Sequence, residues 1–146
     1  MKISTRGRYA LRFMLDLAEH NTNIPVRMKD IANRQHISEK YLEQIAGILN
    51  KAGFVKSIRG AQGGYLLKKA PKEYTIGSIL RLTEGSIAPV SCVEEDNNFC
   101  ERKQMCVSVL LWEKINNAVS EVVDNTTLQD LIDWQKNLCN KEIEMK

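Results

Sequence analysis

Two short helical patterns joined by a tight turn constrain the fold of this chain more than any other feature. The first pattern runs from about Met28 to Gln35, with its apolar residues on one face. After a tight turn, Ser38 is placed to N-cap a second helix, which Gly53 ends as a C′ glycine. The pattern predicts a helix-turn-helix, in which the second helix offers its N-terminal residues to the major groove of DNA. An ordinary helical hairpin is the alternative that the pattern alone leaves open.

The residues at the start of the second helix are the candidate base-reading residues. A carboxylate such as that of Glu43 can accept a hydrogen bond from a cytosine amino group, and the amide of Gln44 can read adenine. We expect Lys40 to meet guanine or a phosphate. The full set predicted to face the DNA is Ser38, Glu39, Lys40, Tyr41, Glu43 and Gln44.

A predicted β-hairpin follows this helix pair directly. Residues 54–58 alternate like a strand, residues 59–64 form a glycine-rich turn, and residues 65–69 form the return strand. A hairpin in this place is a wing. Arg59 lies beside three glycines, so the wing tip presents a cation on a backbone slim enough to enter a narrow minor groove. The candidate DNA contacts on the wing are Lys56, Arg59, Gly60 and Gln62.

The helix that precedes this unit is predicted to start after Ser4 and to stop near Asn21. It is apolar on nearly every face, so it is expected to be a core helix. Arg6, Arg8 and Arg12 cluster near its start, where they face solvent or reach a phosphate backbone. Arg8 is therefore added to the candidate DNA contacts.

Three of the four cysteines, Cys92, Cys100 and Cys106, fall within 15 residues on a polar, acidic loop. The N-terminus shows no secretory segment, so we expect a reducing, cytoplasmic compartment that disfavours disulfides. Soft thiolates select iron–sulfur clusters, zinc or copper(I), and these spacings are wider than the two-residue knuckles typical of zinc ribbons. We therefore interpret the three cysteines as ligands of an iron–sulfur cluster. A set of free, redox-active thiols is the alternative.

Charge divides the chain into two unlike halves. Residues 1–72 hold fourteen Lys and Arg against five Asp and Glu, whereas residues 73–146 hold seven against thirteen. The basic half has the composition of a polyanion-binding surface, and the acidic half would be repelled by the same polyanion. We therefore expect a winged helix-turn-helix DNA-binding domain over residues 1–72, and a cluster-binding loop with dimerisation helices over residues 73–146.

The longest predicted helix runs from about Met105 to Asn125 and carries a wide apolar stripe. At 1.5 Å per residue it is about 30 Å long, more than this small domain covers from one side. A partner chain would cover the rest, so we expect a homodimer. After Thr127 we expect only a short helix, with Cys139 beyond it in a loosely ordered polar tail.

Three segments together resemble one known family. Residues 1–10 (MKISTRGRYA), 37–44 (ISEKYLEQ) and 55–67 (VKSIRGAQGGYLL) are similar to the bacterial winged-helix transcription regulators that include the iron–sulfur cluster regulator IscR, the nitric-oxide sensor NsrR and the cysteine-metabolism regulator CymR. The likeness covers about residues 1–138 and is closest to the IscR type. Because members that sense through a cluster carry three cysteines in this region, the resemblance implies a [2Fe–2S] cluster on Cys92, Cys100 and Cys106.

Two features depart from the family pattern. IscR-like proteins have a shorter gap between the first two cysteines than the seven residues here, and a histidine at the position of Val109. NsrR-like proteins take a fourth ligand from an N-terminal aspartate at the position of Arg8. We expect a non-cysteine fourth ligand rather than Cys139. The oxygen donors on the loop itself are Glu94, Glu95 and Asp96.

The sequence therefore predicts a mainly α protein with a small β-hairpin, built as a winged helix-turn-helix domain plus a long dimerisation helix. The expected function is that of a homodimeric repressor that binds a pseudo-palindromic operator in double-stranded DNA and controls iron–sulfur cluster biogenesis genes. A regulator of cysteine metabolism or of the nitric-oxide response is the alternative. A redox enzyme or carrier fits less well, because both histidines lie far upstream of the cysteines. No run of 18 apolar residues occurs, so no membrane partner is expected.

Overall fold

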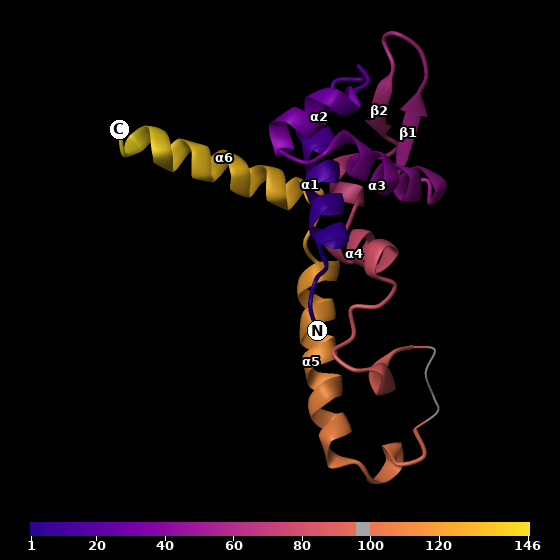
Figure 1. The fold of residues 1–146 in the computed structure, drawn as a ribbon. Helices are drawn as coiled ribbons and strands as arrows, with labels where there is room; N and C mark the ends of the chain where they lie inside the picture. The colour runs from indigo at the N-terminus through magenta and orange to yellow at the C-terminus, as the bar shows by residue number, and fades with distance from the viewer. Residues whose placement is uncertain (96–99) are drawn as a thin grey trace.

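The computed structural model describes residues 1–95 and 100–146, and its fold is mainly α with one small β-hairpin (Figure 1). This confirms the predicted fold class. The helices and strands are α1 (Thr5–Glu19), α2 (Met28–Gln35), α3 (Glu39–Lys51), β1 (Val55–Ile58), β2 (Gly64–Leu67), α4 (Ile76–Glu84), α5 (Val107–Asp124) and α6 (Leu128–Glu144). Between them lie the single-turn 3-10 helices η1 (Pro71–Glu73), η2 (Ser91–Val93) and η3 (Lys103–Met105). Within the described residues, no helix is both long and apolar enough to cross a bilayer.

Helix α1 is the centre of the core, as its apolar composition predicts. It begins where the Ser4 hydroxyl accepts a hydrogen bond from the backbone N–H of Gly7, at 3.2 Å. Phe13, Met14 and Leu17 are fully buried along it. The other helices of the N-terminal part, and β2, pack around this helix.

Helices α2 and α3 form the predicted helix-turn-helix. Between them His36 adopts the left-handed conformation (φ 54°, ψ 45°), which turns the chain, and Ile37 is buried beneath the turn. The Ser38 hydroxyl caps α3 by accepting a hydrogen bond from the backbone N–H of Tyr41, at 3.2 Å. Gly53, with a φ of 78°, follows the helix as the predicted C′ glycine.

The wing is an antiparallel hairpin in which Val55 of β1 lies opposite Leu67 of β2. Strand β2 is also tied to the segment before α2, because the backbone groups of Val26 and Tyr65 exchange two hydrogen bonds, of 3.0 and 2.9 Å. The predicted strands are confirmed within one or two residues. The contact with Val26 fixes the wing to the helix-turn-helix.

The base of the wing is closed by the phenol of Tyr74, which is buried. Its hydroxyl donates a hydrogen bond to the carbonyl of Phe54 at 2.7 Å, and accepts from the backbone N–H groups of Lys68 and Lys69 at 3.1 and 3.0 Å. Burial raises the pKa of Tyr74, so the phenol stays a neutral donor. One side chain thus joins the start of β1 to the end of β2.

One hydrophobic core joins both halves of the chain. Helix α4 and the start of α6 pack against α1, and a backbone bridge pairs Thr75 with Thr127. The core members beyond residue 72 are Tyr74, Ile76, Ile79, Leu80, Ile87, Leu128 and Ile132. The functional division at residue 72 stays a prediction, since the core itself continues across it.

Helices α5 and α6 extend away from this core in different directions (Figure 1). The predicted long helix is confirmed as α5, within which only Val109 is buried. The expectation of a short last helix and a loose tail is wrong, because α6 runs for 17 residues and includes Cys139. No glycine or proline interrupts residues 128–146, and a capping box of Thr127 and Asp130 starts the helix.

Candidate nucleic-acid interface and cysteine loop

The start of α3 presents most of the predicted base-reading side chains to solvent. The opposite face of the helix is buried in the core, so these side chains share the outer face. The Ser38 hydroxyl is already engaged as the cap of α3, so it shapes the helix start. The exposed members of the predicted set are Ser38, Glu39, Lys40, Glu43 and Gln44.

Tyr41 differs from its neighbours because it is half-buried. Its ring meets the ring of Tyr9 edge-on, with centroids 5.7 Å apart and an interplanar angle of 78°. Arg8, one residue before Tyr9, is exposed, and its guanidinium donates to the Thr5 hydroxyl at 3.1 Å. The start of α1, with the predicted contact Arg8, therefore lies beside the start of α3.

The wing tip is a tight turn that carries exposed predicted contacts. Gly60 has a φ of 112°, a conformation that favours glycine, and its carbonyl accepts from the N–H of Gly63 at 3.0 Å. A Cβ at Gly63 would collide with the carbonyl oxygen of Ile58. The turn thus stays slim beside Arg59. The exposed members of the predicted wing set are Lys56, Arg59, Gly60 and Gln62.

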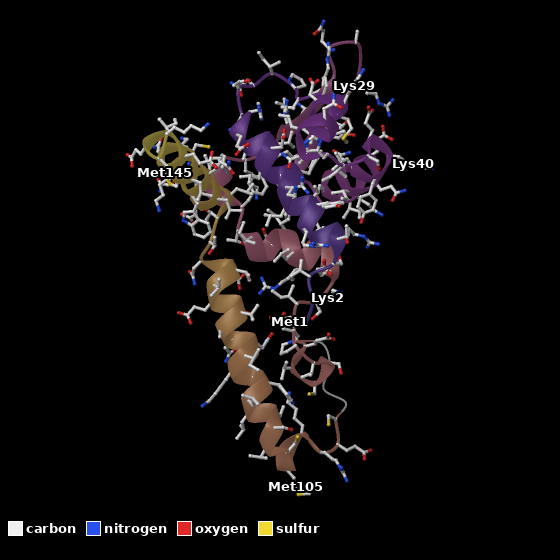
Figure 2. The ribbon with its side chains drawn as sticks, turned by 60° about the vertical axis from the view of Figure 1, so that its left-hand side comes forward. Met1, Lys2, Lys29, Lys40, Met105 and Met145 are labelled. Atoms are coloured by element: carbon white, nitrogen blue, oxygen red, sulfur yellow. The ribbon has the colours of Figure 1, made fainter. Side chains whose placement is uncertain are left out.

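Arg27 is a cation of this surface that sequence reasoning missed. It is exposed just before α2, and its guanidinium donates to the carbonyl of Ala61 in the wing tip at 3.4 Å. Only the long-range pairing of Val26 with β2 brings it there, and helical or strand periodicity carries no such signal. Lys29, in the first turn of α2, is also exposed. Figure 2 shows Lys29 and Lys40 at one end of the molecule, with Met105 at the other.

The three loop cysteines are held by different local structures. Cys92 lies half-buried in η2, and Cys106 lies half-buried at the N-cap of α5. Cys100 is exposed and follows directly after residues 96–99, which lie outside the described part of the chain. All three are free thiols. The loop therefore starts at η2 and ends at the first turn of α5.

Cys106 lies in an environment that favours its thiolate form. Its Sγ lies 3.0 Å from the Ser108 hydroxyl. Hydrogen bonds from the Ser108 side chain and from the backbone N–H of Val109 lower the pKa of Cys106. The N-terminus of α5 adds a positive dipole end, which favours the thiolate, the form that binds metals.

The candidates for a fourth ligand are dispersed. Glu94 and Glu95 line a cavity of about 340 Å³ between η2 and α5, together with Arg81, which is paired with Asp124 at 2.5 and 3.0 Å. Asp96 lies outside the described residues. In residues 1–95 and 100–146, no three His, Cys, Asp or Glu side chains lie close enough together to hold a metal ion.

Cys139 is exposed on α6, which points away from the cysteine loop (Figure 1). The helix ends near Met145, far from Met105 at the end of the loop, as Figure 2 shows. Val109, at the position of the histidine in IscR-like proteins, is buried on α5. Within this chain, neither Cys139, which is remote from the loop, nor Val109, which has no donor atom, supplies a fourth ligand.

Comparison with known proteins identifies the family. Residues 3–134, most of the chain, match the Rrf2 family, which is described as iron-dependent transcriptional regulator. The chain belongs to the Rrf2 family.

Two relatives of this Rrf2 chain are transcriptional regulators with different names. CymR of Bacillus subtilis, an HTH-type transcriptional regulator, is 47% identical over 134 residues, which cover 92% of this chain and 91% of CymR. IscR of Erwinia tasmaniensis, also an HTH-type transcriptional regulator, is 36% identical over 138 residues, which cover 94% of this chain and 82% of IscR.

Solved structures of Rrf2-like proteins superpose on the same fold. CymR, the global cysteine regulator of B. subtilis, has a TM-score of 0.75 at 46% identity, with 92% of this chain and 98% of CymR covered. IscR of T. potens has a TM-score of 0.72 at 41% identity, with 91% and 87% covered.

These matches confirm the predicted family and the winged-helix fold, and make this chain an Rrf2-family transcriptional regulator. The relatives named here are both HTH-type transcriptional regulators. Both the cysteine regulator CymR and IscR are among them. The DNA contacts and cluster ligands assigned above stay predictions.

Proposed function

We propose that this chain is a homodimeric repressor that reads a pseudo-palindromic DNA operator, senses iron–sulfur cluster status and controls cluster biogenesis genes. The position of three cysteines carries this proposal. The loop between α4 and α5 carries Cys92, Cys100 and Cys106. Helix α4 packs on α1 and α3 of the winged helix-turn-helix part, and α5 extends away from that part. A group bound on that loop would therefore contact both parts of the molecule.

In this proposal each protomer reads DNA with the start of α3 and with the wing. The exposed face of α3 enters the major groove, where Glu43 and Gln44 distinguish bases. The wing tip places Arg59 at the adjacent minor groove. Lys40 and Lys56 neutralise phosphates, which supports affinity more than sequence preference.

The apolar face of α5 supports the homodimer. Val107, Leu110, Leu111 and Val122 recur at helical spacing on one face, and Leu110 and Leu111 are 57% and 52% exposed. Burying a side chain of this kind is worth roughly 1.5–3 kcal/mol. A second copy of α5 covers this face, and the resulting two-fold axis sets two helix-turn-helix units on successive half-sites.

The three thiols of the loop are of the chemical type that binds iron–sulfur clusters. Three thiols supply soft ligands, and the pKa of Cys106 is lowered, which increases its share of thiolate, the form that binds metals. Free thiols are maintained in the reducing cytoplasm, where we place the protein. When bound, the cluster, proposed to be [2Fe–2S], supplies a redox-active and exchangeable group. A non-cysteine fourth ligand makes that group labile, which suits a sensor.

Anaerobic purification tests this function. The expected product is brown, contains iron and acid-labile sulfide, and shifts a palindromic duplex with an affinity that changes when the cluster is removed. A colourless protein, or one with bound zinc, whose DNA affinity does not respond to iron would reject the sensing part. Only the DNA-binding part of the proposed function would then remain.

Regulation of cysteine metabolism is the second candidate, favoured by the 47% identity to CymR over 92% of this chain. In that case the thiols act without iron. Operator affinity would then not respond to iron supply, either in the unchanged protein or after replacement of Cys92, Cys100 and Cys106 by Ala. A response to nitric oxide is tested on the same preparation, since the gas would bleach the brown protein and change its DNA affinity.

A further inference from the structure

Asp16 is a buried charged side chain that the proposed DNA contacts do not use. It lies on the inner face of α1 and is only 1% exposed. A buried carboxylate is strongly unfavourable unless it is paired and fully hydrogen-bonded. The identity of its partners therefore indicates what the residue holds in place.

The donors to Asp16 come mainly from the last two residues of α2. Arg34 donates through Nε at 3.0 Å and through Nη2 at 2.7 Å, and Gln35 donates through Nε2 at 2.9 Å. His20, one turn later on α1, lies 3.5 Å away through Nδ1. The hydrogen bonds to Asp16 raise the pKa of Arg34. The pair is a charge-assisted fork, which fixes direction as well as distance.

Gln35 is also held from its other side. Arg12 donates through Nε to the Gln35 side-chain oxygen at 3.1 Å, and through Nη2 to the Gln35 backbone carbonyl. That carbonyl is one of the terminal groups of α2 that lack a partner within the helix. Arg12 also lies 5.4 Å from the ring of Tyr9, which contacts Tyr41 in the first turn of α3. The network thus links α1 to both helices of the helix-turn-helix.

Helix α2 depends on such a network because it is short. It has eight residues, of which only Ile31 and Ala32 are buried. A helix of this length is not stable alone, and apolar contacts do not fix its orientation, whereas hydrogen bonds do. Only residues 36–38 separate Gln35 from α3. Any shift of the end of α2 therefore moves the start of α3.

We propose that Asp16 is a positioning residue for DNA reading: with Arg34 and Gln35 it fixes the end of α2, and so the orientation of the α3 start. The inference rests on the DNA-reading part of the proposed function and adds a residue that touches no DNA. Base reading depends on orientation, whereas phosphate binding depends mainly on charge. Loss of Asp16 should therefore reduce sequence preference selectively.

The test compares Asp16→Asn with the unchanged protein on two duplexes. One duplex carries the operator that the unchanged protein enriches from a random pool, and the other is a scrambled duplex of equal length. We expect the ratio of the two affinities to fall about ten-fold, comparable to the loss of one base contact, with the scrambled-duplex affinity and its salt dependence unchanged. An unchanged ratio in a folded Asp16→Asn protein overturns the inference.

Asp124→Asn is the matched control, since Asp124 also pairs with an arginine, Arg81, but at the contact of α4 with α5. It should keep the affinity ratio, and an equal loss there would overturn the inference.

Should Asp16→Asn not fold, Gln35→Leu provides a second test, because it leaves the Asp16–Arg34 pair intact. It should still lower the affinity ratio, and a normal ratio in that variant rejects the positioning role. If the unchanged protein enriches no duplex, the proposed function itself fails instead.

Discussion

Arg59 provides the sharpest single-residue test of the DNA interface. The glycine turn beside it keeps the wing tip slim, and its side chain is exposed. Arg59→Ala should weaken operator binding by about 1–3 kcal/mol, because a guanidinium in a groove both pairs with bases and neutralises charge. A binding isotherm at fixed salt measures the loss. Lys141→Ala, on the far part of α6, is the control, and equal affinities for the two variants would contradict the assignment.

Glu19 contributes a small amount to the stability of the folded protein at acid pH, and this contribution is lost as the pH rises toward neutral. Glu19 is exposed, so the effect is small: partial desolvation, and then the charge of Asp16, raise the pKa of Glu19 above its ordinary value of 4.5. The folded state therefore favours the protonated form, so its contribution is complete below 4.5 and declines as the pH rises through the raised pKa.

Glu19→Gln should therefore melt at a higher temperature than the unchanged protein at pH 7, because it removes the penalised carboxylate. The difference should close as the pH falls below 4.5, where both side chains are neutral. Thermal melts over this pH range measure it. Glu144→Gln, at the exposed end of α6, should show no such trend, and a difference that grows toward acid pH would show that the sign is wrong.

Cys139 is the residue that distinguishes a three-cysteine site from a four-cysteine site. It lies on α6, which points away from the loop, so Cys139→Ala should retain the visible absorption of the cluster. Cys92→Ala, Cys100→Ala and Cys106→Ala should each abolish it while the protein stays folded. Absorption spectra with iron and sulfide analysis decide the matter. Loss of the cluster in Cys139→Ala would make Cys139 a ligand, supplied by either protomer.

The base of the wing is closed by one hydroxyl, that of Tyr74. Tyr74→Phe would leave the carbonyl of Phe54 and two backbone N–H groups without their buried partner. Such a loss costs about 1–3 kcal/mol. We expect faster hydrogen exchange in β1 and β2 and weaker operator binding, with α5 unaffected. Tyr65→Phe is the control on β2, and identical exchange in both variants would rule out the hydroxyl as the wing clamp.

Most elements could be predicted from the sequence because their ends are encoded locally. Ser4 and Ser38 form the expected caps, and Gly53 ends α3 as expected. Helix α6 is longer than its polar composition predicts, because residues 128–146 contain no glycine or proline to end it. A polar stretch of good helix formers can extend a helix well beyond its buried first turn.

The candidate site was less predictable wherever it depends on contacts distant in sequence. An aspartate in a largely apolar helix gives no sign that it will be buried against Arg34, as Asp16 is. Arg27 reaches the wing only because Val26 pairs with β2. The exposed start of α3 and the wing tip, by contrast, follow from local pattern alone.

At the scale of the whole molecule, the exposed face of α5 makes the oligomeric state testable. Leu111→Glu places a charge in the centre of that face, so it should yield a protein of 16.6 kDa where the unchanged protein has twice this mass. Light scattering after gel filtration measures both. Glu113→Ala, on the other side of α5, should remain dimeric. A Leu111→Glu protein that keeps the double mass would exclude this face as the interface.

The first helix of the chain is covered in part by the last. Leu128 and Ile132, at the start of α6, belong to the same core as Phe13 and Leu17 of α1. A ribosome adds about 5–20 residues per second, so α1 emerges on the order of ten seconds before the segment that completes its cover. The central helix therefore stays partly uncovered until α6 is synthesised, and the core around α1 is completed only then.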